Sequence, residues 1–494
     1  MKSDSPQYEK IYSILKNKIE CGLLPSGSKL PSRASLCAAF GTSEKTVRRV
    51  VSLLEQDGLI DTAQRKRPTV AQRPEAGWPI GGKDALQKLQ RADDAATDDL
   101  LKTGILLCYP LNKQGMLLCS GADWATPEAI VARMDPRQPT EFWRLSNRLW
   151  RFFIARNENE LALRAVDSLG FAQVDPLPGT LAMRQQYHAS LQMLLRTMQQ
   201  GGPAESVPFD DLFSLYALLS DQKGAGVRRV APDSPLCTGT AALARELCKF
   251  QERYSSVYLH LLGLIAVGRY RPGDRLPSHQ QLRQQYGVSI ETTIKAVRVL
   301  QDWGVVTAKR GQGIFVAMDL AALQQIPIDP QLVAVHVRRF LDALALLSLT
   351  AEAVAAHAAS RVTPEESRAL LRQLDSLWND NYLYQRSPIV LLEFITAHIQ
   401  YGALRAIYGV VVDCYHIGPS IPKLVNRAKS AASRGIYDLC IDAVQALAAG
   451  DGPLFAQKAS ALFRHTHQLI VAECKRLGYW QAAMAVYDGS ALWK

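Results

Sequence analysis

The chain of 494 residues has few of the features that mark secreted, membrane-bound or metal-binding proteins. Its nine cysteines are spread from Cys21 to Cys474 without a CxxC pair, which argues for reduced, mostly buried thiols and against a disulfide framework or a zinc site. No run approaches about 20 uncharged apolar residues, and the first residues lack the apolar segment of a signal peptide. The sequence therefore predicts a cytoplasmic protein without a membrane segment.

Features of enzymes are also lacking. No nucleophile with an adjacent base, no paired carboxylates and no glycine-rich phosphate loop stand out, so we expect neither catalysis nor a cofactor. The composition, with 48% hydrophobic and 21% charged residues, is that of an ordinary globular protein with room for roughly three to four domains. The net charge of +11 indicates an anionic partner.

What the sequence does contain is an internal repeat. Residues 8–71 align with residues 254–317 without a gap, so that Tyr8 pairs with Tyr254, Ser43 with Ser289 and Gly58 with Gly304. Chance does not keep such a register over a whole domain, and the chain is therefore predicted to be a tandem duplication.

Each copy has the periodicity of three helices followed by a short hairpin. In the first copy we expect helices over 8–20, from Leu30-Pro31-Ser32 to Phe40-Gly41, and over 44–56, where Ser43 caps the last helix. Two short strands, the wing, follow Gly58. A helix, a short turn and a capped helix form a helix-turn-helix, whose last helix enters the major groove of DNA with its N-terminal part.

These ordered motifs resemble the winged-helix domain of GntR-family bacterial transcription regulators. The resemblance rests on Leu-Pro-Ser, Gly-x-Ser-x-x-Thr, a Gly before two hydrophobic residues, and the Gly-x-Gly-x-Phe-Val wing of the second copy. Family members usually carry two arginines where this chain has Ala34 and Glu44, or Gln280 and Ile290. The resemblance therefore implies an operator that differs from the common family consensus.

The two copies present different residues to DNA. On the recognition helix of copy one, Lys45, Arg48 and Arg49 are predicted to point outward. Arginine is suited to hydrogen bonds with guanine, and lysine to contacts with phosphate. A merely solvated face is the alternative for these three residues. The outward residues of copy two are less basic, so loss of DNA binding by that copy is a second alternative. The residues expected to contact DNA are helix caps, outward helix residues and wing cations: Ser32, Arg33, Ser43, Lys45, Thr46, Arg48, Arg49, Arg65, Lys66, Arg67, Ser278, His279, Ser289, Thr292, Lys295, Lys309 and Arg310.

The segments that follow each copy have helical patterns. In the second half, 337–342, 353–359 and the stretch after Thr363 predict three helices. Arg338-x3-Asp342, an alanine-rich helix and Thr-Pro-Glu-Glu resemble the start of the helical effector domain of the FadR branch, called FCD. The resemblance implies a small-molecule effector site with Arg338, Asp342 and His398.

Two further interpretations concern ligands. Many FCD domains hold a metal through an Asp-x3-His pair, but Phe394 stands four residues before His398, so no metal is expected. In the first half, Arg144, Arg148 and Arg151 form a helical stripe that suits a carboxylate- or phosphate-bearing effector, with a solvated stripe as the alternative.

The predicted fold class is mainly α: two winged helix-turn-helix domains with small β wings, each followed by an all-α helical bundle, in a tandem duplication. We expect winged helices at 1–73 and 246–318, a degenerate FCD-like bundle at 84–235 and an FCD-like effector and dimerisation bundle at 328–480. The predicted function is a ligand-responsive, nucleoid-associated transcription regulator. It would act as a single-chain pseudo-dimer, monomeric or homodimeric, on a double-stranded operator with unequal half-sites. The alternatives are an architectural DNA-binding scaffold without an effector and, less favoured, a winged helix fused to a pyridoxal-phosphate aminotransferase-like domain.

Overall fold

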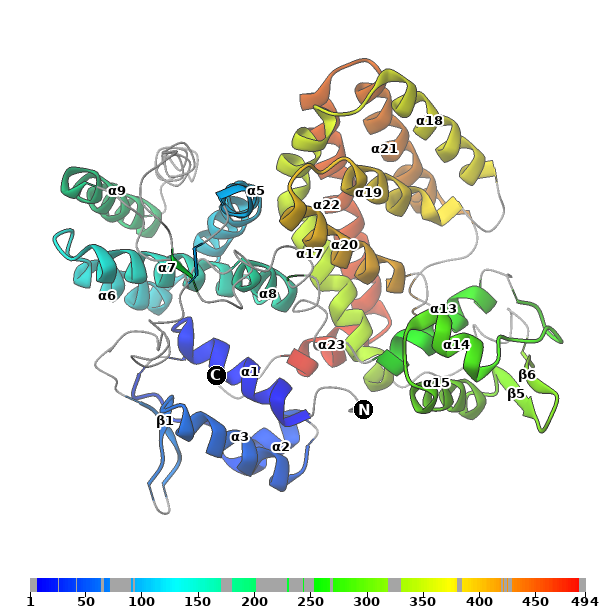
Figure 1. Ribbon diagram of the computed structural model, residues 1–494, viewed down its shortest axis with the longest axis horizontal. Coiled ribbons are helices and arrows are strands. Elements are labelled where there is room, and N and C mark those ends of the chain that lie inside the picture. The colour runs from blue at the N-terminus through cyan, green and yellow to red at the C-terminus, as the bar shows by residue number, and fades with distance from the viewer. Residues whose placement is uncertain are drawn as a thin grey trace. The chain divides into compact units, whose positions relative to one another are not determined.

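The computed structural model describes residues 7–24, 26–40, 42–63, 66–71, 90–91, 94–169, 180–200, 229–230, 243, 253–266, 270–318, 330–379, 384–418, 421, 424 and 429–487 (Figure 1). These residues form two units. The N-terminal unit contains the described residues from 7 to 243 together with 399–408, and the C-terminal unit contains those from 253 to 398 and from 409 to 487.

The first winged helix has the predicted order of elements. It consists of α1 (Gln7–Glu20), α2 (Arg33–Phe40), α3 (Glu44–Gln56), β1 (Ile60–Asp61) and β2 (Thr69–Val70). The two strands pair antiparallel, and the predicted inward residues of α3, from Val47 to Leu54, are buried in a core shared with α1 and α2. Gly41, predicted to end the second helix, and Arg65 in the wing lie outside the described residues.

The second winged helix repeats this plan with a longer hairpin. Its elements are α13 (Arg253–Ala266), α14 (His279–Tyr286), α15 (Ile290–Asp302), β5 (Val306–Lys309) and β6 (Gly313–Val316). Gly287 ends α14 in the left-handed conformation, as predicted for the glycine at this place. In the hairpin, Gly313 has φ 121°, and a Cβ there would lie 2.7 Å from Nε of Arg275, so the turn requires glycine.

The helical part of the N-terminal unit forms the first bundle. Its elements are β3 (Gln90–Arg91), α5 (Asp94–Leu117), the 3-10 turn η1 (Gly121–Trp124), α6 (Ala125–Arg133), α7 (Pro139–Arg156), α8 (Glu160–Ser168), α9 (Leu181–Gln199) and β4 (Arg229–Val230). The helical pattern does not predict the two-residue ladder between β3 and β4. Helix α5 can cross α7 closely because residue 115 is glycine. A Cβ there would lie 1.8 Å from the carbonyl oxygen of Phe153. Aromatic side chains around Phe142 and Tyr187 fill the core.

The helices that follow the second winged helix form the second bundle. They are α17 (Pro330–Ala359), α18 (Pro364–Asn379), η4 (Tyr384–Arg386), α19 (Ser387–Ala397), α20 (Gly402–Ile417), α21 (Ala431–Ala448), α22 (Gly452–Arg476) and α23 (Tyr479–Tyr487). The first residues of α20, 402–408, belong to the N-terminal unit. The expectation of separate helices at 337–342 and 353–359 was wrong, because both belong to α17. The residues between them contain neither glycine nor proline, so nothing in the chain interrupts the helix.

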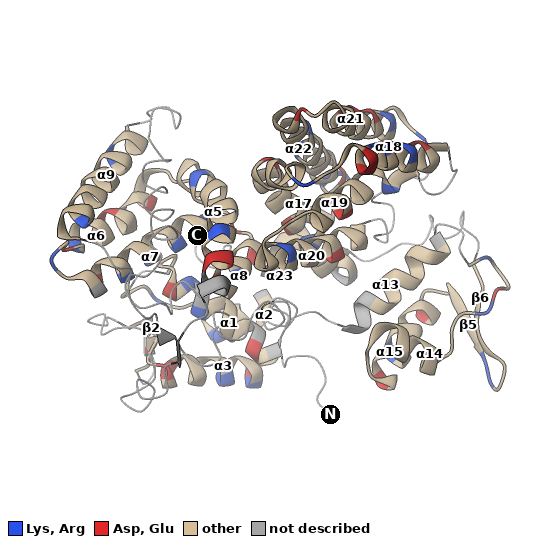
Figure 2. Cartoon of the chain, turned by 45° about the horizontal axis from the view of Figure 1, so that its top comes forward, with Lys and Arg blue, Asp and Glu red and all other residues tan. Residues whose placement is uncertain are grey.

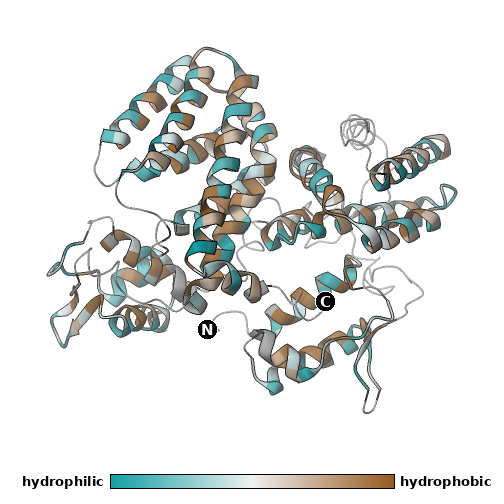
Figure 3. Ribbon diagram, turned by 180° about the vertical axis from the view of Figure 1, so that it is seen from behind, coloured by the Kyte–Doolittle hydropathy of each residue, from teal (hydrophilic) through white to brown (hydrophobic). Residues whose placement is uncertain are grey.

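Helix α17 is the central helix of this bundle. It packs against α22 and α23, and Figure 3 shows hydrophobic and hydrophilic residues alternating along the helices of both bundles. The stretch Val333–Ala359 is long and apolar enough to cross a membrane by length and composition, and an 18-residue segment within it has a mean hydropathy of 1.4. It also carries buried Arg338, Arg339 and Asp342, and a single helix of this kind is weak evidence for a membrane span. We interpret it as a core helix.

Candidate nucleic-acid interface

Both recognition helices begin at a serine cap. In α3, Oγ of Ser43 accepts a hydrogen bond from the backbone N–H of Thr46 at 3.3 Å, and in α15 Oγ of Ser289 accepts from Thr292 at 3.1 Å. The two hydroxyl groups of each pair also lie within hydrogen-bond distance, 3.0 Å in α3 and 2.8 Å in α15. These four residues are among those predicted to contact DNA, and their side chains fix the helix starts that such contacts require.

The helices before them are capped in the same way. Oγ of Ser32 accepts from the backbone N–H of Ser35 at 3.1 Å, and Oγ of Ser278 accepts from Gln281 at 3.3 Å. Arg33, the first residue of α2, is exposed. The N–H groups at a helix start point outward, where they can meet a phosphate.

The guanidinium of Arg48 is held by a glutamate of its own helix. Its Nη2 lies 2.8 Å from Oε1 of Glu44, and the two side chains are 63% and 58% exposed. An exposed pair of this kind contributes at most about 1 kcal/mol, so Arg48 can leave Glu44 for a guanine at little cost. The sequence indicates Glu44 only as the residue that replaces a family arginine.

The neighbouring Arg49 stacks on an aromatic ring of α1. Its guanidinium carbon lies 3.7 Å from the centre of the Tyr8 ring, and Nη2 donates a hydrogen bond to the Tyr8 hydroxyl at 2.9 Å. This contact positions an exposed cation at the side of α3. Tyr8 is one of the repeated residues, but sequence reasoning gave it no role, because the contact joins residues 41 positions apart.

The first wing keeps its strand pairing although its turn lacks glycine. The carbonyl oxygen of Pro68 accepts from the N–H of Leu30 at 2.8 Å, which ties the second wing strand to the segment before α2. Lys66 and Arg67 are exposed. Figure 2 shows positive residues on α3, on α15 and in the β5–β6 hairpin, where exposed Lys309 and Arg310 lie.

The outward face of α15 differs in kind from that of α3. Lys295 and Glu291 are exposed, while His279 is partly buried, with Nδ1 at 3.1 Å from Oγ1 of Thr293 in α15. Burial lowers the pKa of His279, which favours its neutral form. Where α3 has Glu44 and Arg48, α15 has two isoleucines, which are 44% and 48% exposed.

The predicted effector residues of the second bundle do not come together at one cavity. Nε of Arg338 lies 2.9 Å from Oδ1 of Asp342, and both side chains are buried in α17. His398, at the end of α19, instead contacts the carbonyl oxygen of Phe394 at 2.8 Å and Oε1 of Glu366 at 3.4 Å. Within the described part of the chain, no three or more His, Cys, Asp or Glu residues are grouped to hold a metal.

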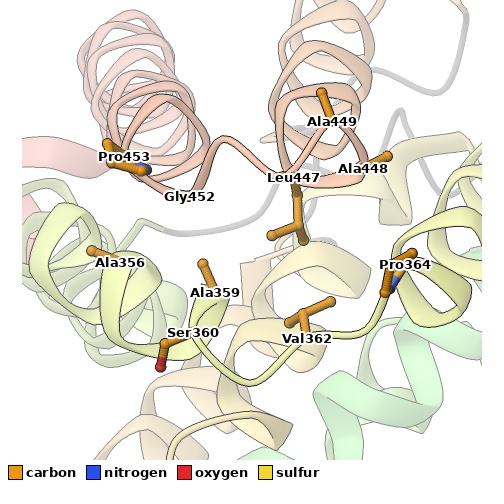
Figure 4. A pocket seen from close by; sticks show the side chains of 11 residues that line it. Ala356, Ala359, Ser360, Val362, Pro364, Leu447, Ala448, Ala449, Gly452 and Pro453 are labelled. Atoms are coloured by element: carbon orange, nitrogen blue, oxygen red, sulfur yellow. The ribbon is translucent and has the colours of Figure 1, made fainter.

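One cavity lies at an end of this bundle (Figure 4). Its volume is about 590 Å³, and it is lined by residues from the ends of α17, α18, α21 and α22, among them Ala356, Leu447 and Pro453, and by Val362 between α17 and α18. None of the lining side chains is charged, and Arg338, Asp342 and His398 are not among them.

The arginine stripe of the first bundle lies at a domain junction. Arg144 pairs with Glu141 on its own helix. A Cβ on Gly22, just after α1, would lie 4.0 Å from Nη2 of Arg148 in α7. Arg151 makes an ion pair with Asp167 of α8, with Nε and Oδ1 at 2.8 Å, and its Nη1 lies 3.8 Å from Oε2 of Glu20 in α1. We call the contact of α1 with α7 and α8 the Glu20 junction.

Comparisons with known proteins agree with this geometry. Residues 7–70 and 253–316 each match the family model described as bacterial regulatory proteins, gntR family. Both winged-helix domains belong to the gntR family.

Curated relatives match over the same kind of segment. An uncharacterized HTH-type transcriptional regulator, YjiR of Escherichia coli strain K12, is 39% identical over 77 residues, which is 15% of this chain and 16% of that protein. The HTH-type transcriptional regulator TreR of Bacillus subtilis is 33% identical over 79 residues, 16% of this chain and 33% of TreR. The histidine utilization repressor of Klebsiella aerogenes is 34% identical over 118 residues, 23% of this chain and 48% of the repressor. The chain thus spans less than half the length of each of these relatives.

Solved structures are also similar to one part of the chain. Streptococcus agalactiae GntR matches with 15% identity and a TM-score of 0.22, over 44% of this chain and 99% of that one. E. coli McbR/YncC matches with 14% identity and a TM-score of 0.20, over 45% and 95%.

Proposed function

We propose that the chain is a cytoplasmic, sequence-specific transcription regulator that binds one DNA operator with two unlike winged helices. The observation that carries the proposal is that both winged helices bury the same helix positions and keep the same serine cap on the recognition helix, while their outward residues differ. Capping and core hold each helix in the geometry that the major groove admits. Differences at the outward positions then change which base pairs are bound.

The first winged helix is proposed to supply most of the affinity. Lys45, Arg48 and Arg49 are exposed on α3, and exposed Lys66 and Arg67 belong to its wing. Arginine forms two parallel hydrogen bonds with guanine O6 and N7, and each lysine or arginine that neutralises a phosphate releases counterions. Affinity that depends on such contacts falls steeply with salt.

We further propose that the two winged helices act as the two subunits of an internal dimer. Ordinary homodimeric regulators bind palindromes because their recognition helices are identical, whereas α3 and α15 are not. One chain can therefore bind a single asymmetric operator as a monomer. The tandem repeat, with a bundle after each winged helix, supports this proposal, and we assign the bundles to assembly and effector binding.

A selection experiment tests the function. The full chain is mixed with a pool of random duplex DNA, bound sequences are recovered, and the affinity for the selected duplex is compared with that for a random duplex over a range of salt concentrations. We expect two unequal half-sites at a fixed spacing and a preference of at least about 10³ over random DNA. An architectural scaffold would give equal affinities and no enriched sequence, which would refute the proposal.

An effector that acts on the second bundle has a separate test. An anionic ligand at Arg338 would have to replace Asp342 as its partner, and removal of one member of a buried pair leaves the other charge uncompensated, at a cost of about 3–5 kcal/mol. Arg338→Ala is therefore compared with the apolar double variant Arg338→Met/Asp342→Leu. Loss of ligand-dependent release of DNA in both variants, with the fold retained in the second, supports an effector role. Unchanged release in the double variant contradicts it.

A further inference from the structure

Two isoleucines are exposed at the start of the second recognition helix. Ile290 is the first residue of α15 and Ile294 follows one turn later, with exposed fractions of 44% and 48%. Residues four apart lie on the same face of a helix. The pair thus forms an apolar strip on the part of α15 that enters the major groove in a helix-turn-helix protein.

This strip is exceptional within the two repeated domains. Among the described residues of both winged helices, Ile290 and Ile294 are the only exposed large hydrophobic side chains. The matching positions of the first copy hold Glu44 and Arg48, which pair at 2.8 Å. The serine caps are the same in both copies and the same helix positions are buried, although Thr293 and Ala296 stand where the first copy has Val47 and Val50.

We propose that Ile290 and Ile294 contact thymine methyl groups, so that the half-site bound by α15 carries thymine where the half-site bound by α3 carries guanine. This inference rests on the proposed DNA-binding function and deepens it. The C5-methyl of thymine is the apolar group that base pairs present in the major groove, and aliphatic side chains recognise it by excluding water. An isoleucine side chain offers no hydrogen bond, so it discriminates by this contact alone.

The surroundings of the strip favour DNA over a protein as its partner. Lys295 and Arg298 on α15, and Lys309 and Arg310 in the wing, are exposed cations that suit the phosphates on either side of a groove. Two side chains are also far too few for a protein interface, which typically buries about 800 Å² on each partner. Glu291, the exposed carboxylate beside Ile290, can accept a hydrogen bond from the amino group of cytosine.

Replacing thymine by deoxyuridine tests the contact, because this change removes only the methyl group. The full chain is titrated with the selected duplex and with duplexes in which single thymines of the half-site assigned to α15 are deoxyuridine. For wild type we expect each contacted methyl to contribute about fourfold in affinity, the change that burial of one group of this size produces. For Ile290→Ala/Ile294→Ala the same replacement should have no effect.

Two matched variants of the full chain complete the test. Glu44→Ala/Arg48→Ala, altered at the same positions of the first copy, should keep the deoxyuridine effect in the α15 half-site. Ile290→Glu/Ile294→Arg, which transfers the pair of the first copy, should select a different base at the affected positions.

The outcomes separate this inference from the proposed function. A chain that binds its selected operator tightly but is indifferent to deoxyuridine, or selects no thymine in that half-site, overturns the inference and leaves the function in place. A chain without sequence preference overturns both. If Ile290→Ala/Ile294→Ala leaves DNA binding unchanged and instead abolishes self-association, the strip is a protein contact and the inference is wrong.

Discussion

Replacing Glu20 by glutamine should stabilise the N-terminal unit much more at pH 8 than at pH 5. Glu20 ends α1 in the Glu20 junction, and its side chain is only 11% exposed. Burial raises the pKa of its carboxyl group from 4.5 to about 7, although Arg151 at 3.8 Å and Lys16 at 3.9 Å favour the charged form. The loss of hydration therefore outweighs the attraction of both cations.

The pKa shift fixes the size and the pH range of the effect. A rise from 4.5 to about 7, at about 1.4 kcal/mol per pKa unit, corresponds to at most about 3 kcal/mol of unfolding free energy. Below pH 4.5 the carboxyl group is protonated in both states, and its contribution to stability is fully present. As the pH rises from 4.5 to 7, the unfolded chain releases the proton that the folded chain retains, so this contribution is lost. Glutamine does not titrate and keeps its contribution above pH 7.

Urea denaturation followed by tryptophan fluorescence measures this difference, because Trp143 and Trp150 are buried in α7 of the same unit. We expect Glu20→Gln to exceed wild type by only about 1 kcal/mol at pH 5 and by up to about 3 kcal/mol at pH 8. Glu9→Gln, at the other end of α1, is the control and should keep the wild-type loss of stability between pH 5 and 8. A Glu20→Gln protein that is less stable than wild type at pH 8 would show that attraction to Arg151 outweighs burial, and the reasoning would fail.

The remaining predictions concern DNA binding. Arg48→Ala/Arg49→Ala should weaken operator binding by about 1–3 kcal/mol for each base that these arginines recognise. Thr292→Ala/Lys295→Ala should weaken it by clearly less. Equal effects of the two variants, or selected sites that are perfect inverted repeats, would contradict the asymmetric operator. Replacing residues 65–67 of the first wing by alanine should weaken binding to all DNA sequences alike. It should also reduce the slope of log affinity against log salt concentration by about one unit for each phosphate that the wing neutralises, which titration at several salt concentrations measures. A weakening confined to one sequence would instead indicate that the wing binds bases.

The local structure of the winged helices follows from the sequence. Ser43 before an apolar stripe predicts a helix over 44–56, and α3 has these bounds. The repeat aligns Gly287 with Gly41, which is expected to end a helix, and Gly287 does so in the left-handed conformation. Such signals can be read in one dimension, because a cap, a stripe and a terminating glycine act on residues at most one or two helical turns away. The repeat adds a second, independent copy of each signal.

The surroundings of the candidate site residues were decided by tertiary structure. The sequence shows Arg49 on the outer face of a helix, but only the packing of α1 against α3 places the Tyr8 ring beneath it. The stripe from Arg144 to Arg151 suits an anion site by its spacing, whereas the fold brings Glu20 and Asp167 to Arg151 and makes it part of a domain junction.

The sequence by itself determined that the chain is a duplicated, mainly helical protein with two capped recognition helices, because helix periodicity and caps depend on neighbouring residues. Tertiary structure alone decided which outward residues are paired and which are open. Arg49 stacks on the ring of Tyr8, 41 residues away in α1, while Ile290 and Ile294 are left exposed to solvent. That distinction depends on how the domain packs, since a side chain's partners and its contact with water are set by residues distant in the sequence.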